Sequence, residues 1–379
     1  MKNLLIFLFL LISSNIVEAE DRIKVRLYTD VKIAEFVFTP MSNGYRLMTD
    51  DSAIIAIPLN KKVNISLEDL KVKIKFGDSL VGIYKKVQML KNGFINSFQI
   101  QLIKPDKKPL NFDDGLIVSI LDNSLIIINY INIDYYVAGV VEAEGGSRAP
   151  MEYFKTQAVL CRTYVLGHFY RHTDQGYNIC DKVHCQVYRG KCRNSDILMA
   201  AIATRGMTLV DSSGNYILSA FHSNCGGQTV SSLDVWTKSM PYLRPVTDTF
   251  CRNSQNAKWD KKIPVNDWIN YLKSNGCSIN QENMNDYLTF KQPFRKSFYD
   301  VNGAQIPLKN FRTKFNLKST FFETTTDGSY VLLTGRGHGH GVGMCQEGAM
   351  KMALSGYNYL QIIDFYFHGV KISYKQIPE

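Results

Sequence analysis

One glutamate lies where a carboxyl group could act as an acid. Glu144 follows the apolar run "YVAGVV" and precedes Gly145 and Gly146. The run is typical of a buried strand, and the two glycines lack side chains that would keep a ligand from the backbone. Apolar surroundings raise the pKa of a carboxyl group, so Glu144 could hold a proton near neutral pH. Glu142 would point to the same side of a strand and is the rival. An ordinary solvated loop acid is the alternative.

A group of potential metal ligands lies in the segment "HTDQGYNICDKVHCQVYRGKC". Cys180, His184 and Cys185 lie close together, with His172 and Cys192 nearby, and thiolates and imidazoles are ligands that zinc prefers. His184 and Cys185 are adjacent and would need a sharp bend to bind one ion together. A disulfide is the alternative in an oxidising compartment, and spacing alone leaves zinc and disulfide open. Any zinc here is expected to be structural, because a catalytic zinc keeps an open position.

Glycine alternates with other residues from Gly335 to Gly343, and His338 and His340 lie between the glycines. In an extended chain both imidazoles would point to the same side and could chelate a metal. The Gly-Lys-Ser/Thr ending of a phosphate-binding loop is missing. We therefore expect the glycines to let a bulky ligand approach the backbone, with a metal loop as the alternative.

Three polar residues interrupt the apolar stripe of a helix that the sequence predicts after Pro150. They are Lys155, Gln157 and Arg162. Lys155 and Arg162 are two helical turns apart and therefore share a face. Such a pair could bind an anionic or hydroxyl-rich ligand, or hold Glu144 by a salt bridge. A solvated helix face is the ordinary alternative.

The elements that must position these residues indicate an α+β fold. Residues 21–129 contain short runs rich in Val, Ile, Leu and Tyr, separated by Asn, Asp, Gly and Pro, and further strands are expected up to residue 143. Helices are predicted at "NSDILMAAIATRG", at "PVNDWINYLKSNG" and twice after residue 345, with a hairpin after residue 206. We expect a strand-rich N-terminal domain at 20–118 and a mixed helix and strand catalytic region at 119–379, with a cleft between them.

The first residues, "MKNLLIFLFLLISSNIVEAED", are typical of a signal peptide over residues 1–19 that is cleaved after Ala19. An uncleaved anchor or a buried first strand is the alternative. Export would place the protein in the periplasm or the cell-wall space. The net charge of +10 suits an anionic polymer or a membrane face, and nucleic acid is not an expected partner outside the cytoplasm.

Four separated stretches resemble the stage II sporulation protein D (SpoIID/LytB) family. They are "YVAGVVEAEGGSRAPMEYFKTQAVLCRTYVL", "CDKVHCQVYRG", "FHSNCGGQT" with "YLRPVTD", and "GRGHGHGVGMCQEGAMKMALSGYNYLQIIDFYFHGVKI". The family contains lytic transglycosylases of peptidoglycan. These cut the β-1,4 bond between N-acetylmuramic acid and N-acetylglucosamine and leave an anhydromuramoyl end. The resemblance implies glycan strands of peptidoglycan as the substrate.

The resemblance also assigns roles to residues. It places the catalytic glutamate on Glu144. It places substrate-binding positions on two motifs, which hold Lys155, Gln157, Arg162 and Tyr164, and His340, Gly341, Met344 and Gln346. Some members hold a zinc ion near the cleft on a loop similar to the one with Cys180, His184 and Cys185, so a structural zinc is expected and no cofactor is required for the chemistry.

This chain departs from the family pattern at several positions. Gly145 and Gly146 stand where a Met-Pro pair is common, and Cys225 and Cys345 stand where serine or a small residue is common. Cys225 could be a ligand or a disulfide partner for the cysteine loop. These differences affect the expected loop shape and sugar preference more than the acid itself.

Two rival functions remain from the sequence. A muramidase would use water and a second acid, Glu142 or Asp174, and would leave reducing ends. A non-catalytic cell-wall protein that enhances an amidase is the other rival, because the family also includes modifiers of other wall enzymes. We favour the lytic transglycosylase because the acid is retained.

Overall fold

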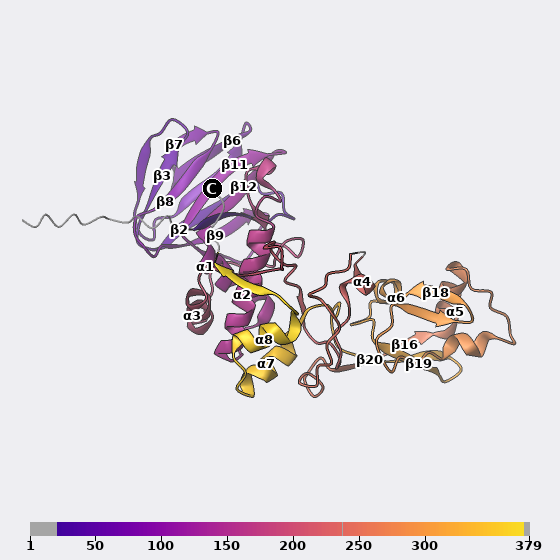
Figure 1. The fold of residues 1–379 in the computed structure, drawn as a ribbon. Coiled ribbons are helices and arrows are strands. Elements are labelled where there is room, and N and C mark those ends of the chain that lie inside the picture. The colour runs from indigo at the N-terminus through magenta and orange to yellow at the C-terminus, as the bar shows by residue number, and fades with distance from the viewer. Residues whose placement is uncertain (1–20, 237, 375–379) are drawn as a thin grey trace, which may run out of the picture.

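A computed structural model describes residues 21–236 and 238–374 of this protein. The signal-peptide cleavage predicted after Ala19 lies outside the described residues. Mixed helices and sheets confirm the α+β class (Figure 1). Among the described residues, no helix combines the length and the apolar character that crossing a membrane requires.

Two sheets form the N-terminal half. The first has the order β13 (Ile179–Cys180), β1 (Arg22–Leu27), β12 (Ser124–Asn132), β11 (Gly115–Leu121), β8 (Val87–Lys91), β3 (Tyr45–Thr49) and β4 (Ile54–Ile57). The second has the order β10 (Leu110–Asp113), β9 (Ser97–Lys104), β2 (Glu35–Ser42), β5 (Val63–Glu68), β6 (Lys71–Phe76) and β7 (Ser79–Tyr84). Buried and less buried residues alternate along β2, as in a strand with one face in a core. Phe38 of β2 packs edge-on against Tyr45 of β3 at 5.2 Å between ring centroids, so the two sheets face each other.

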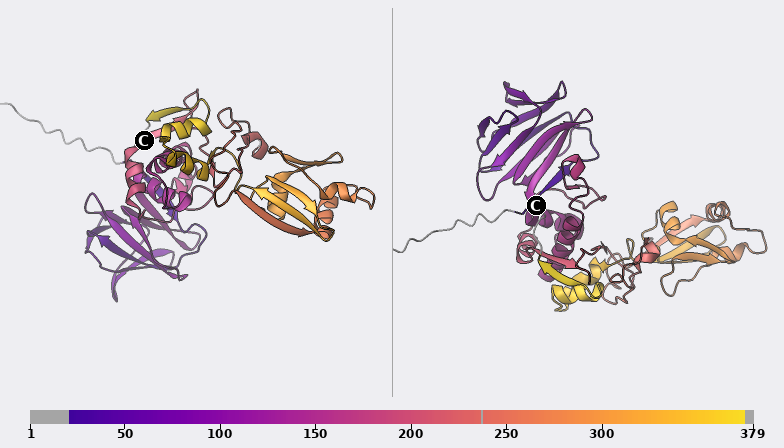
Figure 2. Two further views of the ribbon diagram at one scale, coloured as in Figure 1. Left: turned by 90° about the horizontal axis from the view of Figure 1, so that it is seen from below. Right: turned by 45° about the horizontal axis from the view of Figure 1, so that its top comes forward.

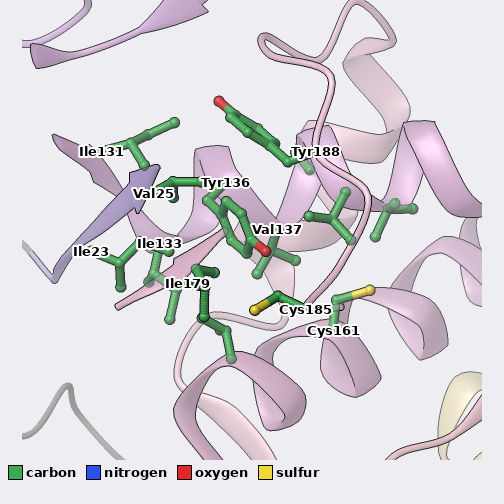
Figure 3. Packing of buried hydrophobic residues seen from close by; sticks show 14 of the residues in the cluster. Ile23, Val25, Ile131, Ile133, Tyr136, Val137, Cys161, Ile179, Cys185 and Tyr188 are labelled. Carbon is green, nitrogen blue, oxygen red and sulfur yellow. The ribbon is translucent and has the colours of Figure 1, made fainter. Parts of the chain in front are cut away.

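A group of helices follows the sheets. Its members are α1 (Ile133–Gly145), α2 (Met151–Gly167), α3 (Ser195–Ala203), α7 (Gln346–Leu354) and α8 (Tyr359–Tyr366). α2 contacts each of the other four. Side chains of α1, among them Tyr136 and Val137, join those of β1 and β12 in one core (Figure 3). The 3-10 helix η1 (Thr173–Gln175) lies in the connection from α2 to β13.

The strand expected up to residue 143 is wrong, because α1 begins at Ile133. The Asn132 side chain accepts a hydrogen bond from the backbone N–H of Asp134, which satisfies an N–H group that the first helical turn leaves free. Asp134 also places a negative charge in that first turn, where the helix dipole favours it. Glu144 therefore lies in the last turn of a helix rather than at the end of a strand.

The helices predicted from the other segments are confirmed, and the hairpin after residue 206 is present in a short form. Val210 and Tyr216 form an antiparallel bridge, and the N–H groups of Asp211 and Ile217 donate to the oxygens of Asn215 and Leu209. The longer partner of β14 (Met207–Val210) is β22 (Lys371–Tyr374), near the end of the chain. Nearby, β15 (Phe221–His222) pairs in parallel with β21 (Met344–Cys345). The short helix α4 (Ser232–Val235) follows β15.

A smaller unit has a hydrophobic core of its own, around Trp268 and Phe311. Its elements are β16 (Lys258–Pro264), α5 (Val265–Ser274), η2 (Met284–Leu288), β17 (Phe298–Val301), β18 (Ala304–Pro307), α6 (Leu308–Lys314), β19 (Phe322–Thr326) and β20 (Tyr330–Arg336). Figure 2 shows this unit, in orange, projecting away from the two sheets in both views. The larger core instead runs from the sheets through the helices, so the boundary expected after residue 118 falls inside β11. The domain division itself stays a prediction.

Candidate active site

Glu144 lies half-buried in the last turn of α1, and its Oε1 accepts a hydrogen bond from the backbone N–H of Val187 at 2.9 Å. Burial raises the pKa of this carboxyl group above its ordinary value, although the Val187 N–H and the charge of Arg189 act in the opposite direction. A carboxyl group with a raised pKa can hold a proton at a higher pH and donate it. Neither Val187 nor Arg189 was selected from the sequence, although both lie in the stretch "CQVYRG" that carries the resemblance.

The segment that supplies the Val187 N–H is held firmly between α1 and the N-terminal sheets. A Cβ atom on Gly139 of α1 would lie 2.4 Å from the backbone oxygen of Gly190, so only glycine allows this approach. Gly190 itself has a φ of 95°, and a Cβ there would lie 2.2 Å from the Asn111 oxygen. Two close backbone contacts thus fix the loop against which Glu144 rests.

Glu142, the alternative acid from the sequence, binds backbone N–H groups instead. On a helix, residues two positions apart differ by about 200° in direction, so Glu142 and Glu144 do not share a side. The Glu142 carboxylate accepts hydrogen bonds from the backbone N–H groups of Arg193 and Asn194, just before α3. It therefore connects α1 to the start of α3.

Gln346 contacts Glu144, although it lies about 200 residues later in the sequence. As the first residue of α7, it donates from Nε2 to the backbone oxygen of Glu144 at 3.1 Å. Tyr153, which the sequence did not single out, also lies here. Among the residues that the structure describes, its buried hydroxyl has no hydrogen-bond partner, and it lies 2.7 Å from the position of a Cβ on Gly145. The missing side chain of Gly145 thus makes room for Tyr153, whereas the position of a Cβ on Gly146 is open.

The two cations of α2 have partners other than Glu144. Arg162 is only 1% exposed and donates from Nη2 to the Asp134 carboxylate at 2.9 Å. Lys155 pairs with Glu152 at 2.7 Å, on a more accessible part of the helix. The salt bridge to Glu144 and the shared cationic face suggested by the sequence are therefore wrong. Arg162 is a buried structural residue and is not placed to contact a substrate.

The two other α2 residues that the resemblance assigned to substrate binding, Gln157 and Tyr164, have neighbours of their own. Gln157 is completely buried, and its amide nitrogen lies 3.9 Å from the sulfur of Cys161. Tyr164 points toward the loop with the metal ligands, where its hydroxyl donates to the His184 oxygen at 3.4 Å and accepts from Arg171. A substrate contact for either residue stays a prediction.

The glycines of the loop at 335–343 make room for the protein itself. Gly339, Gly341 and Gly343 have φ values of 110°, 85° and 70°, which side-chain-bearing residues rarely adopt. A Cβ on Gly343 would lie 2.2 Å from the Ala220 oxygen, and one on Gly341 would lie 2.7 Å from the Arg295 guanidinium. The expectation that these glycines admit a ligand is therefore wrong for these three positions.

Around the same loop, Met344 and His340 are held in place by the β15 segment. Met344 is buried and pairs with Phe221 across the two parallel strands. The His340 Nε2 lies 2.9 Å from the Phe221 oxygen, and the Val342 N–H donates to its Nδ1 at 3.0 Å. Burial lowers the pKa of His340 to about 4, so the ring is neutral at pH 7 and donates from Nε2.

His340 also lines a cavity of about 380 Å³, together with the basic side chains of Lys296, Lys309 and Arg312 and the acidic Asp234. Glu144 does not line this cavity. His338 lies elsewhere, with its Nδ1 3.4 Å from the Asn256 side-chain oxygen. Among the described residues, neither histidine belongs to a group that could hold a metal.

The four donor atoms of His172, Cys180, His184 and Cys185 lie within 4.8 Å of one another. A turn in which the Cys185 N–H bonds to the Lys182 oxygen makes the sharp bend, so the adjacent His184 and Cys185 both point inward. The sequence named His172 only as a neighbour, and Cys192 does not join the group. Two thiolates and two imidazoles form a donor set that suits tetrahedral zinc.

The sequence of this chain is similar to those of several known proteins. A family model described as SpoIID, stage II sporulation protein, matches residues 121–210. An uncharacterized protein of Brachyspira hyodysenteriae is 28% identical over 329 residues, which cover 85% of each chain. The stage II sporulation protein D of Bacillus subtilis is 27% identical over 263 residues, covering 65% of this chain and 76% of that protein. An amidase enhancer of Bacillus subtilis is 27% identical over 287 residues, covering 62% of this chain but 40% of that protein.

Proposed function

This chain belongs to the stage II sporulation protein D family, and on that premise we propose that it is a peptidoglycan lytic transglycosylase. We further propose that it cleaves the β-1,4 bond between N-acetylmuramic acid and N-acetylglucosamine with Glu144 as its acid and base. The observation that carries the proposal is the half-buried Glu144 carboxyl, whose pKa burial raises while a fixed backbone N–H holds it in one orientation.

The chemistry needs only one carboxyl group. Protonated Glu144 donates its proton to the glycosidic oxygen as the bond to C1 of the muramic acid breaks. The resulting carboxylate takes the proton of the C6 hydroxyl of that sugar, and the C6 oxygen attacks C1 to close the anhydro ring. Acid and base assistance of this kind contributes about 10²–10⁴-fold in rate.

The placement of Glu142 supports this route over a two-acid route. A muramidase of the water-using kind requires a second carboxylate that is free to activate water. Glu142 instead accepts two backbone N–H groups before α3, and Asp174 lies in the 3-10 helix η1 beside the loop that holds the metal ligands. A single acid therefore accounts for the chemistry with the fewest additional requirements.

A zinc ion on His172, Cys180, His184 and Cys185 would be structural, since four protein donors leave no open position for a substrate. It would hold the loop that leads from Cys185 to Val187 and so to the Glu144 carboxylate. Export of the protein to the periplasm or the cell-wall space is part of the same proposal, because the substrate lies there.

The test is digestion of purified sacculi with the wild-type protein, E144Q and E142Q. Glutamine keeps the size of the side chain and its oxygen, so E144Q should fold and accept the Val187 N–H but cannot exchange a proton. We expect new glycan ends from the wild type and from E142Q and none from E144Q. Equal release of ends by E144Q and the wild type would refute the role of Glu144.

A second candidate function is supported by the likeness to the Bacillus subtilis amidase enhancer. Under this alternative the protein would bind the wall and stimulate an amidase without cutting glycan. Sacculus binding and amidase stimulation that both survive in E144Q, with no new glycan ends from any form, would favour it.

A further inference from the structure

A second cluster of potential metal ligands lies away from the Cys/His loop. It consists of Cys225, Asp248, Cys251 and Cys345, all buried, with one donor atom from each within 4.8 Å of the others. Cys225 follows β15, Cys345 ends β21, and Asp248 and Cys251 lie three positions apart in the segment before β16. The idea that Cys225 joins the loop at Cys180 is therefore wrong, because its neighbours are Cys251 and Cys345.

The distances in the cluster suit a tetrahedral ion. Zinc–sulfur bonds of about 2.3 Å in tetrahedral geometry place neighbouring sulfurs about 3.8 Å apart. The Cys225 and Cys251 sulfurs are 3.3 Å apart, and the Cys225 sulfur is 3.3 Å from Asp248 Oδ2. All pairs of donor atoms lie within 4.8 Å of one another, and the expected sulfur–sulfur distance falls inside this limit. Small movements would therefore let all four donors reach one ion.

Backbone N–H groups orient the sulfur of Cys345. Its sulfur accepts hydrogen bonds from the backbone N–H groups of Cys225 at 3.3 Å and of Gly348 at 3.4 Å. Cys345 is also the N-cap of α7, where the positive end of the helix dipole stabilises negative charge. Two N–H donors at one buried sulfur are the kind of outer contact that orients metal ligands.

Asp248 is oriented in the same manner. Its Oδ1 accepts from the Phe250 N–H at 2.9 Å, and its Oδ2 accepts from the Tyr366 hydroxyl at 2.9 Å. Arg295 contributes a positive charge beside the cluster and donates from Nη2 to the Cys225 oxygen at 2.7 Å. A buried carboxylate among three thiols is costly unless a cation compensates it, and a divalent ion would do so.

We propose that Cys225, Cys251, Cys345 and Asp248 form a second zinc site. Binding would release the protons of the three thiols, and no change of oxidation state is needed. The ion would join the β15 and β21 segments to the start of α7. Gln346, which follows Cys345 and donates to the Glu144 oxygen, would then be held by the same site.

The site is tested by metal analysis of the purified full-length chain and its variants. We expect C345S and C225S each to bind one zinc fewer per chain than the wild type. C180S should separately lose the zinc of the Cys/His loop, if that loop is loaded. C277S is the matched control, because Cys277 is a buried cysteine in the separate core around Trp268. Its zinc content should equal that of the wild type.

A second measurement tests the site without changing its ligands, in case C345S or C225S does not fold. The C180S/C185S protein, loaded with cobalt(II), should still show an intense near-ultraviolet thiolate-to-cobalt band from the remaining three thiolates. An unchanged zinc content in folded C345S would overturn the proposal. So would a native chain lighter by two hydrogens with a Cys225–Cys251 disulfide peptide, because that bond would use up two of the ligands.

Discussion

Replacement of Arg162 by methionine should destabilise the protein while leaving its chemistry in place. The Arg162 guanidinium is 1% exposed and donates to Asp134 Oδ1 at 2.9 Å. It also donates to the backbone oxygens of Ala201 and Thr204, each at 2.8 Å. It therefore joins α2 to the start of α1 and to the end of α3.

The magnitude follows from what the variant leaves behind. Methionine fills much of the space. Asp134 is itself 2% exposed, and among the described residues it would keep only the Arg205 side chain, at 2.7 Å, as its cation. Removal of one partner from a buried ion pair costs about 3–5 kcal/mol. A loss of about 4 kcal/mol raises the ratio of unfolded to folded protein by nearly a thousandfold, since each 1.4 kcal/mol is tenfold.

The assay is urea unfolding of R162M beside K155M as the control on the same helix. Lys155 and Glu152 are 25% and 29% exposed in their side chains, so loss of that pair should cost no more than about 1 kcal/mol. A double-mutant cycle with D134N should show coupling between Asp134 and Arg162. If R162M were as stable as the wild type but had lost glycan cleavage, Arg162 would contact the substrate and the structural role would be refuted.

Three further predictions concern stability and metal content. Because the folded pKa of Glu144 lies above its unfolded value, folding takes up a proton, and wild-type stability falls as the pH rises from the unfolded toward the folded pKa. E144Q should remove that fall in a plot of Tm against pH, and an unchanged slope would contradict it. G343A should lower Tm more than G356A, because both glycines have positive φ but only Gly343 has an atom, the Ala220 oxygen, at 2.2 Å from a new Cβ; equal losses would contradict the close packing. H172A should lose one zinc per chain that H168A retains, and equal zinc in both variants would exclude His172 as a ligand.

The acid and its neighbourhood could be predicted from the sequence more readily than the element that carries it. The run before Glu144 is rich in valine, which favours strands, yet Asn132 and Asp134 begin a helix there. Propensity was outweighed by the N-cap and by packing of the α1 face on the sheets. This change of element separates Glu142 from Glu144, which an extended strand would have placed side by side.

The glycine loop shows why close packing is hard to predict. Alternating glycines indicate that something approaches the backbone, but not whether it is a ligand or another part of the chain. Here the neighbours of Gly341 and Gly343 are Arg295 and Ala220, which are far away in sequence. The cluster of Cys225, Cys251 and Cys345 escaped prediction for the same reason. The pairing of β15 with β21 brings Cys225 to Cys345, and Cys251 reaches them from a separate segment of the chain.

The mass of the glycan ends released from purified sacculi tests most directly whether Glu144 acts alone as acid and base. The wild-type protein should release muramic acid ends of the anhydro form, which are lighter by one water than reducing ends. E144Q should release none while retaining the Tm of a folded protein. Reducing ends from the wild type, or anhydro ends from E144Q at the wild-type rate, would contradict the proposal that Glu144 acts alone as acid and base.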